Sequence, residues 1–204
     1  LVNNATYGFR VLAGCRAFLM PQQISTVARC FETMPVRYML ADEVGLGKTV
    51  EACSILSILA SENKDLRVLI VAPGALVSQW QNELHYKYSM DVQVASFQAK
   101  LCILPMEDLD KAELVLNAQW DLAIIDETHR LLNNDGWYQQ IKAVSRKVQH
   151  ILLLSATPIQ DRNEEYRRLL VLLNPEQYGD MTPQRFAWMV KKQKSIQQKV
   201  NQQL

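Results

Sequence analysis

This sequence of 204 residues lacks long apolar runs and a leader-like start. The longest apolar runs, Val68 to Ala72 and Leu169 to Leu173, fall far short of the ~18 to 20 residues that a membrane span requires. The beginning of the chain does not combine a basic segment, an apolar stretch and a small-residue cleavage site, as a secretory signal does. We therefore expect no transmembrane helix, no membrane partner and a cytoplasmic location.

Paired cysteines and an excess of one charge are also missing. Cys15, Cys30, Cys53 and Cys102 stand far apart, without C-x-x-C spacing or a nearby histidine, so we expect free thiols rather than a zinc site or a disulfide framework. Lys and Arg number 22 against 21 Asp and Glu, so bulk charge does not indicate a polyanionic partner. A nucleic-acid function has to rest on motifs.

Short apolar runs alternate with longer amphipathic stretches from Val36 onward. This alternation predicts repeated β-α units, and so a mainly parallel sheet covered by helices in a three-layer α/β/α sandwich. The predicted strands span residues 37–41, 67–72, 92–96, 122–126 and 151–155. The predicted helices span residues 22–33, 48–61, 75–88, 111–117, 136–148 and 163–173, followed by a last helix within 183–204 that projects outward.

The segment YMLADEVGLGKTVEAC predicts a phosphate-binding loop between a strand and a helix. Glycines let backbone N–H groups curl around phosphate oxygens, and the helix N-terminus adds partial positive charge. Lys48 is expected to bind the β- and γ-phosphates of ATP, and the Thr49 hydroxyl to ligate Mg²⁺. The expected cradle comprises Glu43, Val44, Gly45, Leu46, Gly47, Lys48 and Thr49.

The strict pattern G-x-x-x-x-G-K-[ST] fails at its first position, where Asp42 stands. The alternative interpretation is an ordinary glycine-rich turn. The apolar strand before the turn and the helix after it favour the phosphate loop.

Two adjacent carboxylates follow the strand in DLAIIDETHR. Asp126 can hold Mg²⁺ through its waters, and Glu127 can orient and polarise the attacking water. The alternative is a pair of solvated acidic residues that open the next helix. Together with Lys48, these two are the expected catalytic residues.

A further strand, in HILLLSATPIQD, ends in small hydroxyl residues. Ser155 and Thr157 could hydrogen-bond to the acidic motif and sense the γ-phosphate, although a proline-containing turn after a strand is common. The order of the three motifs, each at the end of a strand, favours one nucleotide site over three coincidences.

The motifs together resemble those of superfamily-two helicases: ADEVGLGKT, VAPGALVSQWQNEL, DETH and LSATP are similar to motifs I, Ia, II and III. More narrowly, the chain resembles the Swi/Snf-type ATPases and their bacterial RapA-like group, over about Phe18 to Asp180. The narrower resemblance rests on DEVGLGKT, on SATPIQDRNEEYRRLLVLLNP and on the pattern formed by Pro73, Leu76, Gln79, Trp80 and Glu83.

The resemblance implies a RecA-like P-loop NTPase lobe over residues 1–180, with the Ser155 strand between those of Lys48 and Asp126. Residues 181–204 would form a helical extension toward a second RecA-like lobe that this chain lacks. The second lobe of the family supplies an arginine finger worth ~10³ to 10⁵ in rate, so this chain alone should bind ATP weakly and hydrolyse it barely.

The resemblance also implies roles for residues outside the phosphate loop. Gln23 would read adenine, although an exposed residue at a helix start is the alternative. Trp80 belongs to the motif Ia pattern, but packing of its helix is a competing explanation for a tryptophan at this position. Phosphates of a DNA strand would meet the helix N-terminus at Pro73, Gly74 and Ala75. Coupling of the nucleotide state to movement would involve His129, Ser155 and Thr157.

The sequence departs from the family pattern in three places. Thr128 stands where alanine is usual, a small change that we expect to be harmless, and Asp161 replaces a common asparagine. Nothing after Pro183 resembles motifs IV to VI.

The predicted function is Mg²⁺-dependent ATP hydrolysis coupled to movement along double-stranded DNA, near the nucleoid if the source is bacterial. The alternatives are a strand-separating helicase, a motor subunit of a restriction or defence complex, and a nucleotide-gated module that recruits a partner such as RNA polymerase.

Overall fold

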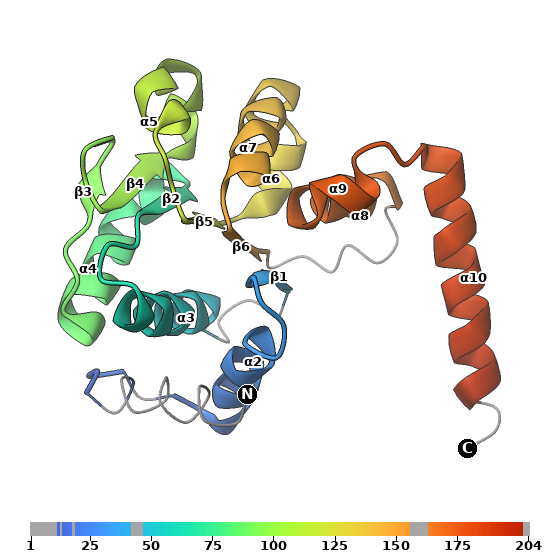
Figure 1. Cartoon of the computed structure of the whole chain (residues 1–204), viewed down its shortest axis with the longest axis horizontal. Coiled ribbons are helices and arrows are strands. Elements are labelled where there is room, and N and C mark those ends of the chain that lie inside the picture. The colour runs from blue at the N-terminus through green and yellow to red at the C-terminus, as the bar shows by residue number, and fades with distance from the viewer. Residues whose placement is uncertain (1–11, 13, 18, 42–46, 156–162, 202–204) are drawn as a thin grey trace.

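A computed structural model describes residues 12, 14–17, 19–41, 47–155 and 163–201 (Figure 1). Within these residues one six-stranded sheet has the order β1-β6-β5-β2-β4-β3, and every adjacent pair is parallel. The strands are β1 Arg37–Leu40, β2 Val68–Ala72, β3 Gln93–Val94, β4 Leu101–Pro105, β5 Leu122–Ile125 and β6 His150–Leu154. The order confirms that β6, which ends before Ser155, lies between β1 and β5.

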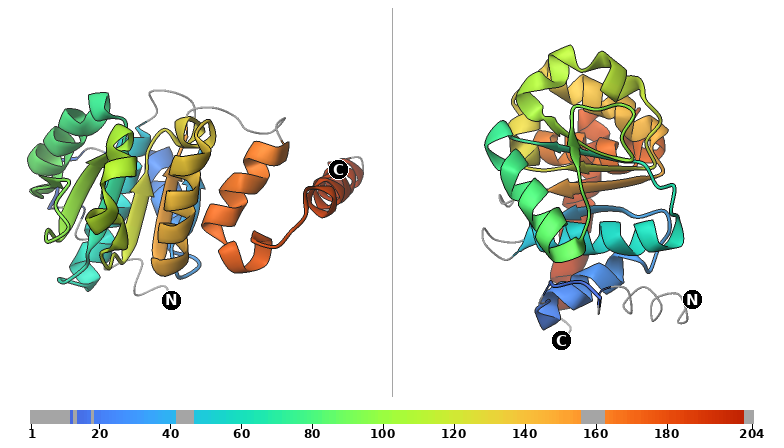
Figure 2. Two further views of the ribbon diagram at one scale, coloured as in Figure 1. Left: turned by 90° about the horizontal axis from the view of Figure 1, so that it is seen from above. Right: turned by 90° about the vertical axis from the view of Figure 1, so that its left-hand side faces the viewer.

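Apart from His150 at the start of β6, the central strands are apolar because helices cover both faces of the sheet. All residues of β2, β5 and β6 are buried, and alternate residues enter two separate cores: Ile124 lies in one and Ile125 in the other. The first core is completed by α2 Pro21–Cys30, α3 Lys48–Glu62 and α4 Val77–Tyr88. The second is completed by α5 Glu113–Asn117, α6 Thr128–Leu132, α7 Asp135–Lys147 and α8 Asn163–Leu173. Figures 1 and 2 show these three layers, which confirm the predicted sandwich.

Two parts of the sheet differ from the prediction. The strand predicted over residues 92–96 is only β3, whose two residues are exposed at the sheet edge, and Ala95 with φ of 50° ends it. Strand β4 was not predicted at all, because the apolar run Leu101–Pro105 is short and ends in a proline, which signals a turn as readily as a strand.

Most predicted helices are confirmed to within about two residues at each end, but α2 ends at Cys30 rather than at residue 33, and the short helices Thr128–Leu132 and Pro175–Tyr178 were not predicted. A 3₁₀ turn, η1 Gly74–Leu76, precedes α4, so the α-helix starts later than the predicted residue 75. Another, η2 Met106–Lys111, precedes α5.

Arg37 joins the ends of two helices to the start of β1. Its guanidinium donates hydrogen bonds to the carbonyls of Ser145 and Val148 at the end of α7, and of Leu172 and Leu173 at the end of α8. Helix C-termini leave carbonyls without intrahelical partners, so this side chain satisfies groups of both helices at once. Burial lowers the pKa of Arg37 below its usual value.

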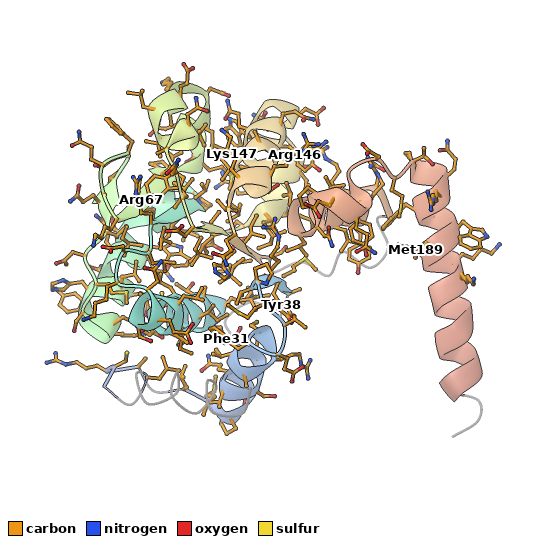
Figure 3. The ribbon with its side chains drawn as sticks, viewed as in Figure 1. Phe31, Tyr38, Arg67, Arg146, Lys147 and Met189 are labelled. Carbon is orange, nitrogen blue, oxygen red and sulfur yellow. The ribbon has the colours of Figure 1, made fainter. Side chains whose placement is uncertain are left out.

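The last helices extend beyond the sandwich. After α9 Pro175–Tyr178, α10 Pro183–Asn201 contacts α8 through the buried Phe186, whose ring meets Tyr166 edge to face at 5.9 Å. Figure 3 shows Met189 on α10, away from the side chains that fill the cores. The division near residue 180 and the second lobe beyond it stay predictions.

The four cysteines all lie within the described residues and form no disulfide; three are buried and Cys15 is half-buried. Burial raises the pKa of Cys30 to about 12, which keeps that thiol protonated at neutral pH. Among the described helices, none combines the length and apolar character that crossing a membrane takes.

Candidate active site

Three segments that are distant in sequence meet at one edge of the sheet. The carboxyl ends of parallel strands share an edge, so β1, β5 and β6 deliver the residues that follow them to the same side. The chain after β1 enters α3 at Lys48, β5 is followed by Asp126, and β6 by Ser155. The structure thus places Lys48, Asp126 and Ser155, one residue from each of motifs I, II and III, at the same edge of the sheet.

The entry to α3 is built around Gly47, whose φ of 85° lies in the left-handed region that favours glycine. A Cβ at this position would collide with Nε2 of Gln23. Gln23 is 3% exposed, and its Oε1 accepts a hydrogen bond from the Met20 backbone N–H at 2.9 Å. The predicted adenine reader therefore packs against the turn that enters α3.

Lys48 and Thr49 lie half-buried in the first turn of α3. The first N–H groups of a helix have no intrahelical acceptor, which suits this turn to an anion. Four of the predicted cradle residues lie outside the described residues: Glu43, Val44, Gly45 and Leu46.

Both carboxylate oxygens of Asp126 have a donor. Oδ2 accepts a hydrogen bond from Nε1 of Trp80 at 2.9 Å, and Oδ1 accepts one from the Glu127 backbone N–H at 2.8 Å. Asp126 is 7% exposed, and burial raises its pKa above the usual value, while the Trp80 hydrogen bond and the Lys48 charge counteract part of that rise. Lys48 and Asp126 are therefore within electrostatic reach of each other.

Glu127 adopts a left-handed backbone conformation, with φ of 48° and ψ of 50°, directly before α6. Such a conformation costs a non-glycine residue ~1 to 3 kcal/mol and persists only where its surroundings enforce it. The Glu127 Oε2 lies 3.1 Å from Nδ1 of His129, although the two atoms are not aligned as a hydrogen bond. The second carboxylate of the acidic pair thus lies beside His129.

Motifs II and III are connected by a hydrogen bond that the sequence did not predict. The Oγ1 of Thr128, which is fully buried, donates to the Leu154 carbonyl at 3.1 Å. The hydroxyl that joins the motifs therefore belongs to motif II, and it comes from the residue that stands where alanine is usual. Ser155 is also buried, and its N–H donates to the Leu40 carbonyl at 3.1 Å. Thr157 lies outside the described residues.

The Thr128 hydroxyl takes the place of a backbone donor of the sheet. The His150 N–H donates to the Asp121 carbonyl, and because bonding direction alternates along a strand, the Leu154 carbonyl also faces β5. The Glu127 N–H would be its next backbone partner, but that group donates to the neighbouring carboxylate. Thr128 thus satisfies an acceptor that the turn at Glu127 would otherwise leave unpaired.

Motif Ia lies on the far side of β5, after β2. Pro73 is buried, whereas Gly74 and Ala75 are exposed in the 3₁₀ turn before α4. The Gly74 N–H donates to Oε2 of Glu107 at 2.8 Å. A carboxylate of this chain therefore accepts the hydrogen bond from an N–H group that was expected to bind a DNA phosphate. Binding of nucleic acid at these residues stays a prediction.

The profile of the SNF2-related domain matches residues 26–204, most of the chain. The chain belongs to the SNF2-related family. The resemblance to Swi/Snf-type ATPases, drawn from four motifs, is therefore confirmed.

Curated relatives of this SNF2-related chain are much longer proteins. The uncharacterized ATP-dependent helicase YqhH of Bacillus subtilis is 38% identical over 169 residues, covering 78% of this chain and 30% of that protein. The RNA polymerase-associated protein RapA of Haemophilus influenzae is 35% identical over 215 residues, covering 94% of this chain and 23% of that protein. The chain thus spans less than a third of either relative.

Two solved structures share the fold of this SNF2-related lobe. The Sulfolobus solfataricus SWI2/SNF2 ATPase core in complex with dsDNA has a TM-score of 0.74 at 22% identity, covering 84% of this chain and 38% of that chain. The SWI2/SNF2 ATPase core domain of the same organism has a TM-score of 0.72 at 23% identity, with the same coverage. These likenesses confirm the RecA-like architecture.

Sequence reasoning missed the contacts of Trp80, Thr128 and Glu107. A signal existed for Trp80, because a buried indole N–H usually finds a hydrogen-bond acceptor. No comparable signal identified Thr128, whose partner is a backbone carbonyl of another strand.

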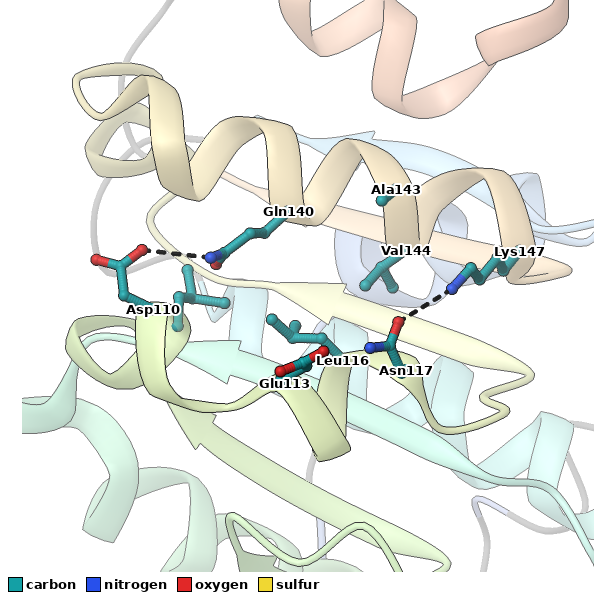
Figure 4. Close-up of a pocket in the computed structure, with 9 residues that line it drawn as sticks. Asp110, Glu113, Leu116, Asn117, Gln140, Ala143, Val144 and Lys147 are labelled. Atoms are coloured by element: carbon teal, nitrogen blue, oxygen red, sulfur yellow. Dashed lines mark hydrogen bonds between the residues drawn. The ribbon is translucent and has the colours of Figure 1, made fainter.

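A cavity of about 300 Å³ between η2, α5 and α7 contains none of the predicted site residues (Figure 4). Two hydrogen bonds join side chains of its lining, from Gln140 to Asp110 and from Lys147 to Asn117. This cavity is separate from the edge where Lys48 and Asp126 meet.

Proposed function

We propose that this chain is the ATP-binding lobe of a DNA-dependent SNF2-type motor that hydrolyses ATP with Mg²⁺ when paired with a second lobe. One observation carries the proposal: the first turn of α3, with Lys48, lies at the same sheet edge as Asp126, whose carboxylate is held by two donors.

The residues at this edge fit a nucleotide and its metal. Gly47 enters α3 with φ of 85°, a conformation that suits glycine and that occurs where backbone approaches a ligand closely. Carboxylate and hydroxyl oxygens are ligands that Mg²⁺ prefers, and it is commonly held by one or two carboxylates together with substrate phosphates. Thr49 and Asp126 would hold the metal, which neutralises charge on the phosphates when bound.

Each side chain would perform a separate task. Lys48 would attract the β- and γ-phosphates as a compact cation. Glu127 would accept a hydrogen bond from the attacking water and orient it, with His129 beside its carboxylate. Gln23, next to Gly47, would contact the adenine.

The partners are proposed for a protein that joins this lobe to a second one. One solved relative holds dsDNA and another relative is RNA polymerase-associated, which supports duplex DNA as the track and leaves RNA polymerase as a further candidate partner. We propose that Pro73, Gly74 and Ala75 contact the DNA backbone and that a second RecA-like lobe closes over ATP. A cytoplasmic location belongs to the same proposal.

The test is ATP hydrolysis by a protein that joins this chain to a second lobe, measured with and without saturating duplex DNA. We expect DNA to raise the rate, Lys48→Ala to lose ATP affinity, and Glu127→Gln to bind ATP without hydrolysing it. Lys147→Ala, on the exposed end of α7 (Figure 3), is the matched control and should leave both unchanged. Turnover that DNA does not raise would contradict the motor and favour a nucleotide-gated module, and normal turnover in Glu127→Gln would remove Glu127 from the mechanism.

A further inference from the structure

Trp80 donates a side-chain hydrogen bond to the carboxylate that is expected to face Mg²⁺. It lies on α4, is 1% exposed, and places its Nε1 2.9 Å from Oδ2 of Asp126. We propose that Trp80 is a positioning residue: its indole N–H fixes the orientation of the Asp126 carboxylate and so determines how strongly Mg²⁺ increases the affinity for ATP. This inference rests on the proposed function.

The indole is held in a rigid frame that includes the phosphate-binding helix. Trp80, Leu84 and Tyr88 recur every fourth residue and form the buried face of α4. The Tyr88 hydroxyl donates to the Val50 carbonyl at 2.9 Å and lies 2.8 Å from Oγ of Ser54, both on α3. Because α3 begins at the predicted phosphate-binding lysine, these bonds fix the indole N–H relative to the phosphate site.

The two donors to Asp126 approach different oxygens, so rotation of the carboxylate would break at least one bond. Both bonds join an N–H to an ionised group, the stronger class of protein hydrogen bond. At 7% exposure, little water is present to replace a lost donor. Each carboxylate oxygen can still accept a further hydrogen bond, which leaves room for water molecules that surround a metal ion.

A role in packing alone predicts a different outcome. Phenylalanine keeps an aromatic ring in the core but has no N–H. If Trp80 only packs the core, Trp80→Phe should lower the stability of the chain and leave the effect of Mg²⁺ on ATP affinity unchanged. A positioning residue would instead change the response to Mg²⁺, because loss of a hydrogen bond to a metal-ligating group typically lowers metal affinity by ~10 to 100-fold.

The experiment measures the dissociation constant of ATP for this chain with Mg²⁺ and with EDTA, in the wild type, Trp80→Phe and Trp120→Phe. Trp120 is the matched control, because its buried indole donates at 2.7 Å to the Val115 carbonyl. We expect Trp80→Phe to reduce the Mg²⁺-dependent gain in affinity by about tenfold or more, with binding in EDTA unchanged. Trp120→Phe should keep the wild-type gain. An unchanged gain in folded Trp80→Phe would overturn the inference.

A second measurement does not depend on the folding of a variant. The wild-type chain has four tryptophans, so its ¹⁵N NMR spectrum contains four indole N–H resonances that can be assigned through the backbone. We expect the Trp80 resonance to move further on addition of ATP with Mg²⁺ than with ATP alone, and the Trp120 resonance to stay in place. Equal responses of the two indoles would overturn the proposal.

The proposed function and the role of Trp80 can be refuted separately. If wild-type chain and Lys48→Ala bind ATP alike, the proposed function fails and the inference fails with it. If Lys48→Ala loses ATP but Trp80→Phe retains the full effect of Mg²⁺, the nucleotide site stands and only the role of Trp80 is wrong.

Discussion

Thr128→Val removes one hydroxyl from motif II and leaves a side chain of similar shape. In the structure this hydroxyl is the donor to the Leu154 carbonyl, at 3.1 Å and with Thr128 fully buried. A buried acceptor left without a donor costs ~1 to 3 kcal/mol, so the free energy of unfolding should fall by that amount. For a domain of this size the melting temperature should fall by ~2 to 4 °C per kcal/mol.

The assay is urea unfolding followed by circular dichroism, with Thr26→Val as the matched control. Thr26 also donates to a backbone carbonyl at 3.1 Å, that of Gln22, but this bond is exposed and water can replace it. The control should therefore change stability by less than ~0.5 kcal/mol. If Thr128→Val unfolds at the same urea concentration as the wild type, or if both variants lose equal stability, the reasoning about this buried acceptor is wrong.

Three further predictions concern the turn before α3, the helix ends and pH. Gly47→Ala should weaken ATP binding in a titration, because φ of 85° costs alanine ~1 to 2 kcal/mol of backbone strain and the new methyl group would displace the side-chain amide of Gln23, the proposed adenine contact. Arg37→Met should lower the free energy of unfolding by ~3 kcal/mol or more in urea, because the ends of two helices lose their charged donor. Burial lowers the pKa of His150 below 6.5, and its Nδ1 accepts the Val36 N–H, so the folded state keeps the ring neutral. The unfolded chain then binds a proton that the folded chain does not, so stability should fall as pH drops below ~6.5, and His150→Gln should flatten that slope.

Much of the fold could be predicted because the central strands are buried on both faces. The residues of β2, β5 and β6 are apolar except for His150 at the start of β6, and that pattern located each strand to within a residue or so. The strands at the sheet edge were harder to predict. Neither residue of β3 is buried, and β4 ends at a proline, so neither had the pattern of a central strand.

Part of the candidate site could likewise be predicted from the sequence, and part could not. That Lys48 and Asp126 share an edge follows from chain order, since each comes after a parallel strand. The bonds from Trp80 to Asp126 and from Thr128 to Leu154 join residues 46 and 26 positions apart, and no spacing along one chain indicates them. They depend on how α4 packs and on where β5 stops, which only the folded structure determines.

Paramagnetic NMR tests the central claim, that Lys48 and Asp126 serve one site for ATP and its metal, most directly. Mn²⁺ replaces Mg²⁺ in the presence of ATP, and its unpaired electrons broaden the signals of nearby nuclei in the ¹⁵N-labelled chain. The account predicts the strongest broadening at Lys48, Thr49, Asp126 and Glu127. It predicts none at Lys147, the last residue of α7. Broadening centred on the cavity beside Gln140, or broadening that Lys48→Ala leaves unchanged, would contradict it.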